Sequence, residues 1–430
     1  MRYYSTSNRD HFVSFREAVL NSLPPDNGLY YPESIPKLAD HSLECLSNRS
    51  LESIGFEMMR PYVGGEIPDE ALDQIINETL SFKIPIKQIE ENIHVLELYH
   101  GPTWAFKDVG ARFLARCIGF FTQEASREID ILVATSGDTG GAVAAGFFQV
   151  PGTRVTILYP KGKVSEVQEK QLTTWGDNIN TYSVDGTFDD CQKMVKQAFL
   201  DKELTQSLNL SSANSINVAR FLPQSIYYAQ IARQLPREKT VVAVPSGNYG
   251  NLTAGLFAWK MGLPLRRFIA SSNINKVVPD YLLTSKYHPR PSVVTYSNAM
   301  DVGSPSNFVR MLELFKGNHK AMTEKVSGYY LTDEETLTAM QKCLNEHHYL
   351  SDPHGVIAYQ ALQEQLSPDE QGIFLETAHP VKFLSVVDKV LSEPIDFHEM
   401  THELMTKTSY ASELPNDYEA FKSVLLSLKN

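Results

Sequence analysis

One lysine in this sequence, Lys107, has a setting that suits covalent chemistry. It lies in the segment HGPTWAFKD, residues 100–108, directly after Trp, Ala and Phe. Apolar surroundings favour the neutral amine of a lysine, and the neutral amine is the form that makes a Schiff base with an aldehyde. The residue types leave a second interpretation open, in which Lys107 is a helix-start lysine that pairs with Asp108 or is solvated.

Three further segments place polar turns where a strand is expected to lead into a helix. The first, ILVATSGDTGG at residues 131–141, offers hydroxyls and the unpaired N–H groups of a helix start, which suit a carboxylate or phosphate. The second, VVAVPSGNYGNLTAG at residues 241–255, has two glycines in its turn that allow the backbone to approach an anion closely. The third, SSANSINVAR, has Asn214 and Ser215 as helix-cap types and then Arg220, which suits bidentate phosphate binding.

Each of these turns, taken alone, is most often a simple helix cap or a structural loop. None matches G-x-G-x-x-G or G-x-x-x-x-G-K-[ST], so a dinucleotide fingerprint and a P-loop are excluded. Ser246 does not stand in a G-x-S-x-G context, which argues against a hydrolase nucleophile. Three such turns in one region indicate a ligand, or ligands, with several anionic groups.

The elements that must position these turns alternate between short β-branched runs and helix-length segments. This alternation is typical of parallel sheets with crossover helices, which bind ligands beyond the carboxyl ends of their strands. The predicted strands span residues 93–98, 130–135, 154–159, 178–184, 240–244, 267–271 and 372–375. The predicted helices span residues 108–125, 140–149, 164–175, 188–200, 218–235 and 252–261.

Residues 1–90 lack this alternation and contain no reactive motif. Amphipathic or helical patterns at 11–20, 51–60 and 69–80 predict a mainly helical N-terminal domain that packs on, or shapes, the rest of the chain.

Composition narrows the class of protein. The chain has 430 residues and a formal net charge of −12, which disfavours nucleic-acid and anionic-membrane surfaces. No apolar run approaches the roughly 20 residues of a membrane span, and the first residues lack the apolar region of a secretory signal. Four scattered cysteines without a C-x-x-C motif suit a reducing compartment, so we expect a cytoplasmic protein.

His347, His348 and His354 lack metal-ligand spacing and are interpreted as surface histidines near a helix end, so no metal is expected.

Five segments follow one another along the chain: HGPTWAFKD, TSGDTGGA, NSINVARFLPQ, PSGNYGNLTAG and ETAHPVKF. In this order they resemble the threonine synthases, which are pyridoxal-phosphate (PLP) enzymes of fold type II in the tryptophan-synthase-β-like group. The opening segments MRYYSTSN and DNGLYYPE resemble the N-terminal domain of that family. The resemblance implies an α/β fold with two open parallel or mixed sheet domains and a mainly helical N-terminal domain. We expect that domain at residues 1–90 and a catalytic region at 91–430, whose smaller subdomain spans roughly 108–215.

The resemblance also implies roles for individual residues. Lys107 would bind the cofactor covalently and later move protons. Thr377 would face the pyridine nitrogen, and Asp138 lies where shorter relatives carry an asparagine that contacts the phenolic oxygen of the cofactor. The remaining cofactor contacts would be Phe106, Gly247, Asn248, Tyr249, Gly250 and Asn251. The substrate would be held by Thr135, Ser136 and Thr139 at its α-carboxylate and by Asn214, Ser215 and Arg220 at its phosphate.

The reaction that the resemblance implies is the last step of threonine biosynthesis. O-Phospho-L-homoserine and water would give L-threonine and phosphate by γ-elimination and β-addition of water, catalysed by a carbon–oxygen lyase. Two alternatives stay open: a related PLP-dependent phospholyase or serine/threonine dehydratase that releases a keto acid, and a catalytically silent PLP-fold scaffold. The expected partner is the small-molecule substrate, with no nucleic acid and no membrane, and the protein would be a monomer or a homodimer.

Overall fold

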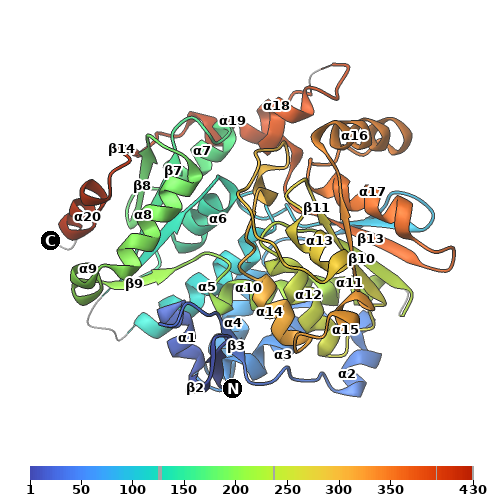
Figure 1. The fold of residues 1–430 in the computed structure, drawn as a ribbon, viewed down its shortest axis with the longest axis horizontal. Helices are drawn as coiled ribbons and strands as arrows, with labels where there is room; N and C mark the ends of the chain where they lie inside the picture. Colours follow the sequence, from blue (N-terminus) through green and yellow to red (C-terminus); the bar gives the residue numbers. More distant parts are fainter. Residues whose placement is uncertain (124–127, 236–237, 394, 429–430) are drawn as a thin grey trace.

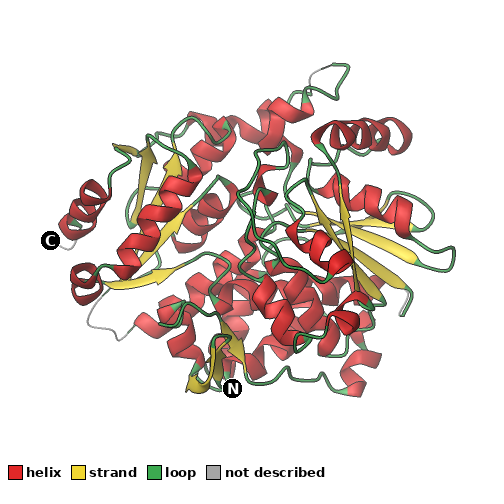
Figure 2. Ribbon diagram, viewed as in Figure 1, coloured by secondary structure: helices red, strands yellow, loops and turns green. Residues whose placement is uncertain are grey.

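The computed structural model describes residues 1–123, 128–235, 238–393 and 395–428 (Figure 1). Two sheets with helices on their faces stand side by side, and the N-terminal elements pack below both of them in the view of Figure 1. Figure 2 shows that strands run through the interior of each half while helices cover them. This is the mixed α/β architecture that the alternation of runs predicts.

The larger sheet contains six strands in the order β12-β11-β10-β13-β5-β4. Its strands are β4 (Ile86–Gln88), β5 (Ile93–Glu97), β10 (Thr240–Pro245), β11 (Arg267–Ser272), β12 (Val326–Tyr330) and β13 (Gln371–Glu376). All neighbours are parallel except β4, which pairs antiparallel with β5. The central strands β10 and β13 are buried nearly throughout, as expected for a sheet covered on both faces.

The smaller sheet contains five parallel strands in the order β14-β8-β7-β6-β9. Its strands are β6 (Ile129–Ala134), β7 (Thr153–Pro160), β8 (Ile179–Val184), β9 (Asn209–Ser212) and β14 (Ser412–Leu414). The edge strand β14 comes from the far C-terminal part of the chain and pairs with β8. Beside it, α20 packs on α8 and α9 (Figure 1).

Helices connect the strands and carry the predicted turns at their N-termini. The helices of this part are α5 (Lys107–Thr122), α6 (Asp138–Phe147), α7 (Glu166–Thr173), α8 (Phe188–Leu200), α9 (Lys202–Ser207), α10 (Val218–Phe221), α11 (Ser225–Gln234), α12 (Gly250–Lys260), α13 (Val277–Thr284), α14 (Phe308–Leu314), α15 (His319–Thr323), α16 (Asp333–His347), α17 (Gly355–Gln365), α18 (Leu384–Val387), α19 (His398–Thr406) and α20 (Tyr418–Ser427). Short 3₁₀ helices are η2 (Leu222–Gln224), η3 (Asn298–Met300) and η4 (Pro380–Phe383).

The N-terminal part combines a small antiparallel sheet with helices. Its elements are β1 (Tyr3–Ser5), β2 (Asn8–Val13), β3 (Tyr30–Pro32), α1 (Phe15–Asn21), α2 (Asp40–Glu44), η1 (Leu46–Asn48), α3 (Leu51–Val63) and α4 (Asp69–Thr79). The helices predicted at 51–60 and 69–80 are confirmed as α3 and α4. The helix predicted at 11–20 is wrong in its first residues, because β2 pairs with β1 and α1 starts only after Ser14, whose side chain forms a capping box with Glu17.

All seven strands predicted from residue 93 onward are confirmed within one or two residues at their ends. The single helix predicted at 218–235 is wrong: it is divided into α10, η2 and α11, since Pro223 lacks an N–H and cannot continue an α-helix. The last residues of the helix predicted at 108–125 fall outside the described residues. Within the described chain, no helix is long and apolar enough to span a membrane, and the four cysteines are free.

Candidate active site

Lys107 is the first residue of α5 and lies in a mostly buried position. Its side chain is 17% exposed, and its Nζ lies 3.6 Å from Asp138 Oδ2 and 4.7 Å from the centre of the Phe106 ring. Burial lowers the pKa of Lys107, and the charges of Lys382 and Arg220 act in the same direction, while Asp138 raises it. The burial and the lowered pKa of Lys107 are those expected of a reactive amine.

The alternative in which Lys107 pairs with Asp108 is wrong. Asp108 is buried and accepts hydrogen bonds from the backbone N–H of Thr103 at 3.0 Å and from its hydroxyl at 2.5 Å. Consecutive residues of a helix point in different directions, so the carboxylate that meets Lys107 comes from another helix, α6.

Thr377 lies beside the lysine because the segment before α5 pairs with the end of β13. Phe106 N–H donates to the carbonyl of Thr377 at 2.8 Å, and Ala105 forms a β-bridge with Ala378. The Tyr227 hydroxyl donates to the Phe106 carbonyl from α11. The hydroxyl of Thr377 makes no hydrogen bond to the described residues, so it remains available to a ligand.

The turn between β6 and α6 uses one of its hydroxyls internally. The Thr135 Oγ1 accepts from the N–H groups of Gly137 at 3.0 Å and Gly140 at 2.8 Å, so those two donors are not free for an anion. Ser136 and Thr139 are half-buried, and their hydroxyls make no hydrogen bond within the described chain. The hydroxyls of Ser136 and Thr139 are therefore available to a ligand, whereas the Thr135 hydroxyl is engaged by the turn.

Asp138 begins α6 and is surrounded by donors. Its Oδ1 lies 2.9 Å from Lys382 Nζ and accepts from Gln168 Nε2 at 3.0 Å. Burial alone would raise the pKa of Asp138, but the charges of Lys382 and Lys107 outweigh it and hold the pKa well below its ordinary value. Asp138 is therefore a carboxylate that is matched by two buried lysines.

The turn between β10 and α12 presents a row of unpaired backbone donors. Within the described chain, the N–H groups of residues 247–252 donate no hydrogen bond, and no side chain caps α12. The N-cap residue Tyr249 has φ of 62°, and its hydroxyl bonds with the Ser272 hydroxyl at 2.8 Å. Tyr249, Gly250 and Asn251 are buried, and the side-chain Nδ2 of Asn251 has no partner. Buried donors of this kind are rarely left unpaired, so the turn has the properties of an anion site.

Gly247 is held close to the backbone of the following loop. A Cβ at this position would lie 2.6 Å from Met300 Cα and 2.8 Å from the Ala299 carbonyl oxygen. Only glycine fits here without movement of the loop.

The segment at residues 211–220 contacts both of the preceding sites. Asn248 Nδ2 donates to Ser215 Oγ at 2.6 Å, and Arg220 donates to the carbonyls of Lys107 at 2.6 Å and Ala213 at 2.9 Å. Arg220 is buried, and burial lowers its pKa to about 10. The segment therefore contacts both the backbone of Lys107 and the turn between β10 and α12.

The helix-cap prediction for this segment is wrong, because the cap of α10 is Asn217. The Asn217 side chain accepts from Ala219 N–H at 3.1 Å. Asn214 and Ser215 lie before the helix, and the Asn214 Oδ1 is buried without a partner. Both are thereby free of a capping role.

Sequence reasoning missed two residues that hold the site together. Lys382 lies in ETAHPVKF, the last of the five ordered segments, and membership of that segment was the only sequence signal for this residue. Arg310 on α14 is fully buried and donates to the carbonyls of Tyr30, Ser215 and Ile216. No motif marks Arg310, and only the fold brings it to this position.

The histidine interpretation also needs a correction at His354. It is 2% exposed, its Nδ1 lies 2.5 Å from Asp352 Oδ1, and its Nε2 accepts from Ala299 N–H at 3.2 Å. Asp352 in turn accepts from Ala378 N–H at 3.2 Å. His354 therefore links the loop that covers Gly247 to the chain beside Thr377, and it is not a surface residue.

Comparisons with known proteins agree along the whole chain. Residues 75–375 match the family described as pyridoxal-phosphate dependent enzyme, residues 2–80 match the threonine synthase N terminus, and residues 354–425 match the threonine synthase C-terminal family. Threonine synthase of Haemophilus influenzae is 44% identical over 429 residues, covering 99% of this chain and 100% of the relative. Threonine synthase of Escherichia coli is 41% identical over 430 residues, with the same coverage.

Solved structures give the same result. The crystal structure of threonine synthase from Escherichia coli superposes with a TM-score of 0.93 at 40% identity and covers 100% of both chains. The PLP-bound threonine synthase from Brucella melitensis superposes with a TM-score of 0.95 at 32% identity, also over 100% of both chains. The chain belongs to the threonine synthase family of pyridoxal-phosphate-dependent enzymes of fold type II.

Proposed function

We propose that this protein converts O-phospho-L-homoserine and water to L-threonine and phosphate, using PLP. One observation carries the assignment of the site: Arg220 donates to the backbone carbonyl of the mostly buried Lys107, and the 211–220 segment that contains Arg220 also contacts a turn whose backbone donors have no partner within the described chain. This is the combination that an aldehyde bearing a phosphate group requires.

The residues present fit this cofactor. The unpaired N–H groups of residues 247–252, at the start of the 11-residue helix α12, match a dianionic phosphate. Gly247 packs closely on the Ala299–Met300 backbone, so a side chain at this position would push the turn and the loop apart. The Asn248 and Asn251 side chains, with Tyr249 and Gly250, would complete the phosphate site, while Phe106, Thr377 and Asp138 would face the ring.

The charged groups around Lys107 include two buried cations, Lys382 and Arg220, and two buried carboxylates, Asp138 and Asp108. Lys382 pairs with Asp138, whereas Arg220 has no carboxylate partner within the described chain and donates to backbone carbonyls. Arg220 is therefore the cation of this group that is left to attract a phosphate or carboxylate.

PLP, when bound, acts as an electron sink that acidifies the protons on carbon atoms next to the substrate nitrogen. Lys107 would remove the proton from the substrate Cα and later return one. Thr135, Ser136 and Thr139 would hold the α-carboxylate, and Asn214, Ser215 and Arg220 would hold the phosphate. Holding the substrate at both ends would present its Cα–H and Cβ–H bonds to Lys107 Nζ.

We further propose domain boundaries, a cellular compartment and an oligomeric state for this protein. Residues 1–90 would form the N-terminal domain, and 91–430 the catalytic region with a smaller subdomain at roughly 108–215. Four strands of the five-stranded sheet, β6 to β9, lie within 108–215 and support this subdomain, while the fifth, β14, comes from the C-terminal part of the chain. The protein would act in the cytoplasm as a monomer or a homodimer, with a small-molecule substrate and without nucleic acid or membrane.

The test is a paired assay of phosphate release and threonine formation from O-phosphohomoserine. The proposal predicts that the two products appear in equal amounts. Phosphate with a keto acid would instead indicate a phospholyase, and a keto acid from serine or threonine would indicate a dehydratase. A protein that binds PLP and releases neither phosphate nor threonine would be a silent scaffold.

A further inference from the structure

Lys382 is a fully buried lysine next to the proposed reactive amine. Its side chain is 0% exposed, and its Nζ lies 2.9 Å from Asp138 Oδ1 and donates to the Thr103 carbonyl at 2.8 Å. Gln171 Nε2 donates to the same carbonyl at 3.1 Å. Burying an ammonium group costs several kcal/mol, so its position requires a strong local partner.

Asp138 divides its two oxygens between the two lysines. Oδ1 receives Lys382 and Gln168, while Oδ2 lies 3.6 Å from Lys107 Nζ, beyond ordinary hydrogen-bond distance. The carboxylate thus forms its close contacts with Lys382 and a looser one with Lys107.

We propose that Lys382 is a positioning residue for Lys107: it fixes Asp138 and offsets its negative charge, so that Lys107 is kept close to Asp138 but ready as a neutral amine to take up the PLP aldehyde. In that step the Lys107 nitrogen would form a double bond to the aldehyde carbon, and the two protons of the amine would leave with the aldehyde oxygen as water. The inference rests on the proposed role of Lys107.

The charged groups that face Lys107 come from three elements. Asp138 on α6 attracts the ammonium form, whereas Lys382 on η4 and Arg220 on α10 repel it. Asp108, next to Lys107 on α5, is directed to Thr103. Without the charge of Lys382, Asp138 would act on Lys107 with less opposition and favour its protonated form.

The test compares Lys382→Gln with Asp138→Asn. Glutamine keeps donors for Asp138 and the Thr103 carbonyl but removes the charge. Each protein is stripped of cofactor and mixed with PLP, and the visible absorption of the lysine-bound cofactor is followed over a pH series. In Lys382→Gln, the pH midpoint of the absorption change should rise by about 1, and uptake of PLP near neutral pH should slow about tenfold. In Asp138→Asn the midpoint should move the opposite way.

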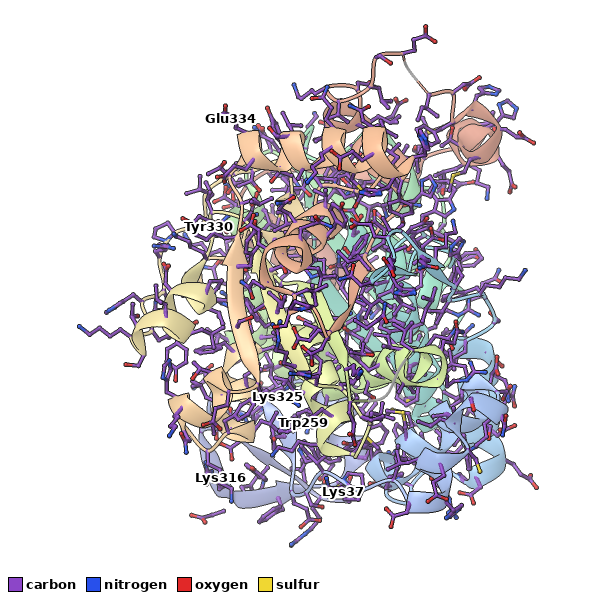
Figure 3. The ribbon with its side chains drawn as sticks, turned by 90° about the vertical axis from the view of Figure 1, so that its right-hand side faces the viewer. Lys37, Trp259, Lys316, Lys325, Tyr330 and Glu334 are labelled. Carbon is purple, nitrogen blue, oxygen red and sulfur yellow. The ribbon has the colours of Figure 1, made fainter. Side chains whose placement is uncertain are left out.

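Lys325→Gln is the matched control. Lys325 is a partly buried lysine that donates to two backbone carbonyls, those of Leu265 and Arg266, but it lies beside Trp259 on an outer face (Figure 3). Its midpoint and uptake rate should equal those of the unchanged protein. If Lys382→Gln does not fold, Lys382→Met is measured in its place.

An unchanged midpoint in the Lys382 variant, or a shift of both site variants in the same direction, would overturn the inference. Because the experiment measures cofactor uptake, its result does not depend on whether the protein catalyses the proposed reaction. A protein that shows these opposite shifts but makes no threonine would refute the proposed function and leave the role of Lys382 intact.

Discussion

Gly247→Ala adds a single methyl group to the turn between β10 and α12, which we propose binds the cofactor phosphate. The added Cβ would lie 2.6 Å from Met300 Cα and 2.8 Å from the Ala299 carbonyl oxygen. Carbon atoms in contact are normally about 3.5–4.0 Å apart, so the turn and the loop must separate by about 1 Å. Both obstructing atoms belong to the backbone, which cannot rotate away as a flexible side chain would.

A displacement of about 1 Å stretches a hydrogen bond from the N–H groups of residues 247–252 beyond its useful range. Losing two hydrogen bonds to a charged phosphate costs about 3 kcal/mol or more, which raises the dissociation constant of PLP about 100-fold. The free energy of unfolding of the cofactor-free protein should fall by about 1–3 kcal/mol from the added volume.

The assay is a titration of the cofactor-free protein with PLP, followed by absorbance, with urea unfolding of the same samples. Gly119→Ala is the control, because its Cβ would meet only the Val150 Cγ1, at 2.9 Å, which can shift. If Gly247→Ala bound PLP as tightly as the unchanged protein, the assignment of this turn to the phosphate would be refuted.

Three further changes address other parts of the site. Arg220→Lys keeps a cation but loses the planar fork, so KM for O-phosphohomoserine should rise about tenfold with PLP still bound; unchanged steady-state kinetics would contradict the phosphate role. Burial lowers the pKa of His379 to about 4, and the nearby His100 acts in the same direction. The ordinary pKa of histidine is about 6.5, so the unfolded chain binds more protons between these two values and stability rises with pH across that window. His379→Gln should make this rise shallower in urea unfolding, and an equal slope in both proteins would be inconsistent with it. Arg310→Met leaves the carbonyls of Tyr30, Ser215 and Ile216 without their donor and should lower the free energy of unfolding by about 3 kcal/mol or more; an unchanged urea midpoint would count against this linking role.

Local patterns predicted the inner strands of the two large sheets but not their edge strands, β4, β9, β12 and β14. The β-branched runs that form β6 and β10 are apolar throughout, so their burial follows from composition. By contrast, β9 has the polar sequence NLSS, and β14 pairs with a strand more than 200 residues away. Pairings of this kind depend on the assembled fold, and no short window of sequence contains them.

The same distinction applies to the site. The apolar neighbours of Lys107 suit a reactive amine but left a solvated or Asp108-paired lysine open. Its carboxylate partner could not be chosen from sequence adjacency, since Asp108 faces Thr103 and Asp138 comes from α6. Lys382 and Arg310 are buried cations, and a buried cation has no signature in composition. Their roles become visible only through the contacts that neutralise them.

Covalent mapping identifies the lysine that binds the aldehyde of PLP, which we propose is Lys107. The PLP-loaded protein is reduced with borohydride, digested, and analysed by mass spectrometry, with Lys107→Ala treated in parallel. We expect the reduced cofactor on the peptide that contains Lys107 and no covalent cofactor in Lys107→Ala. Attachment at Lys382 or at another lysine in the unchanged protein would show that Lys107 is not the residue that binds PLP.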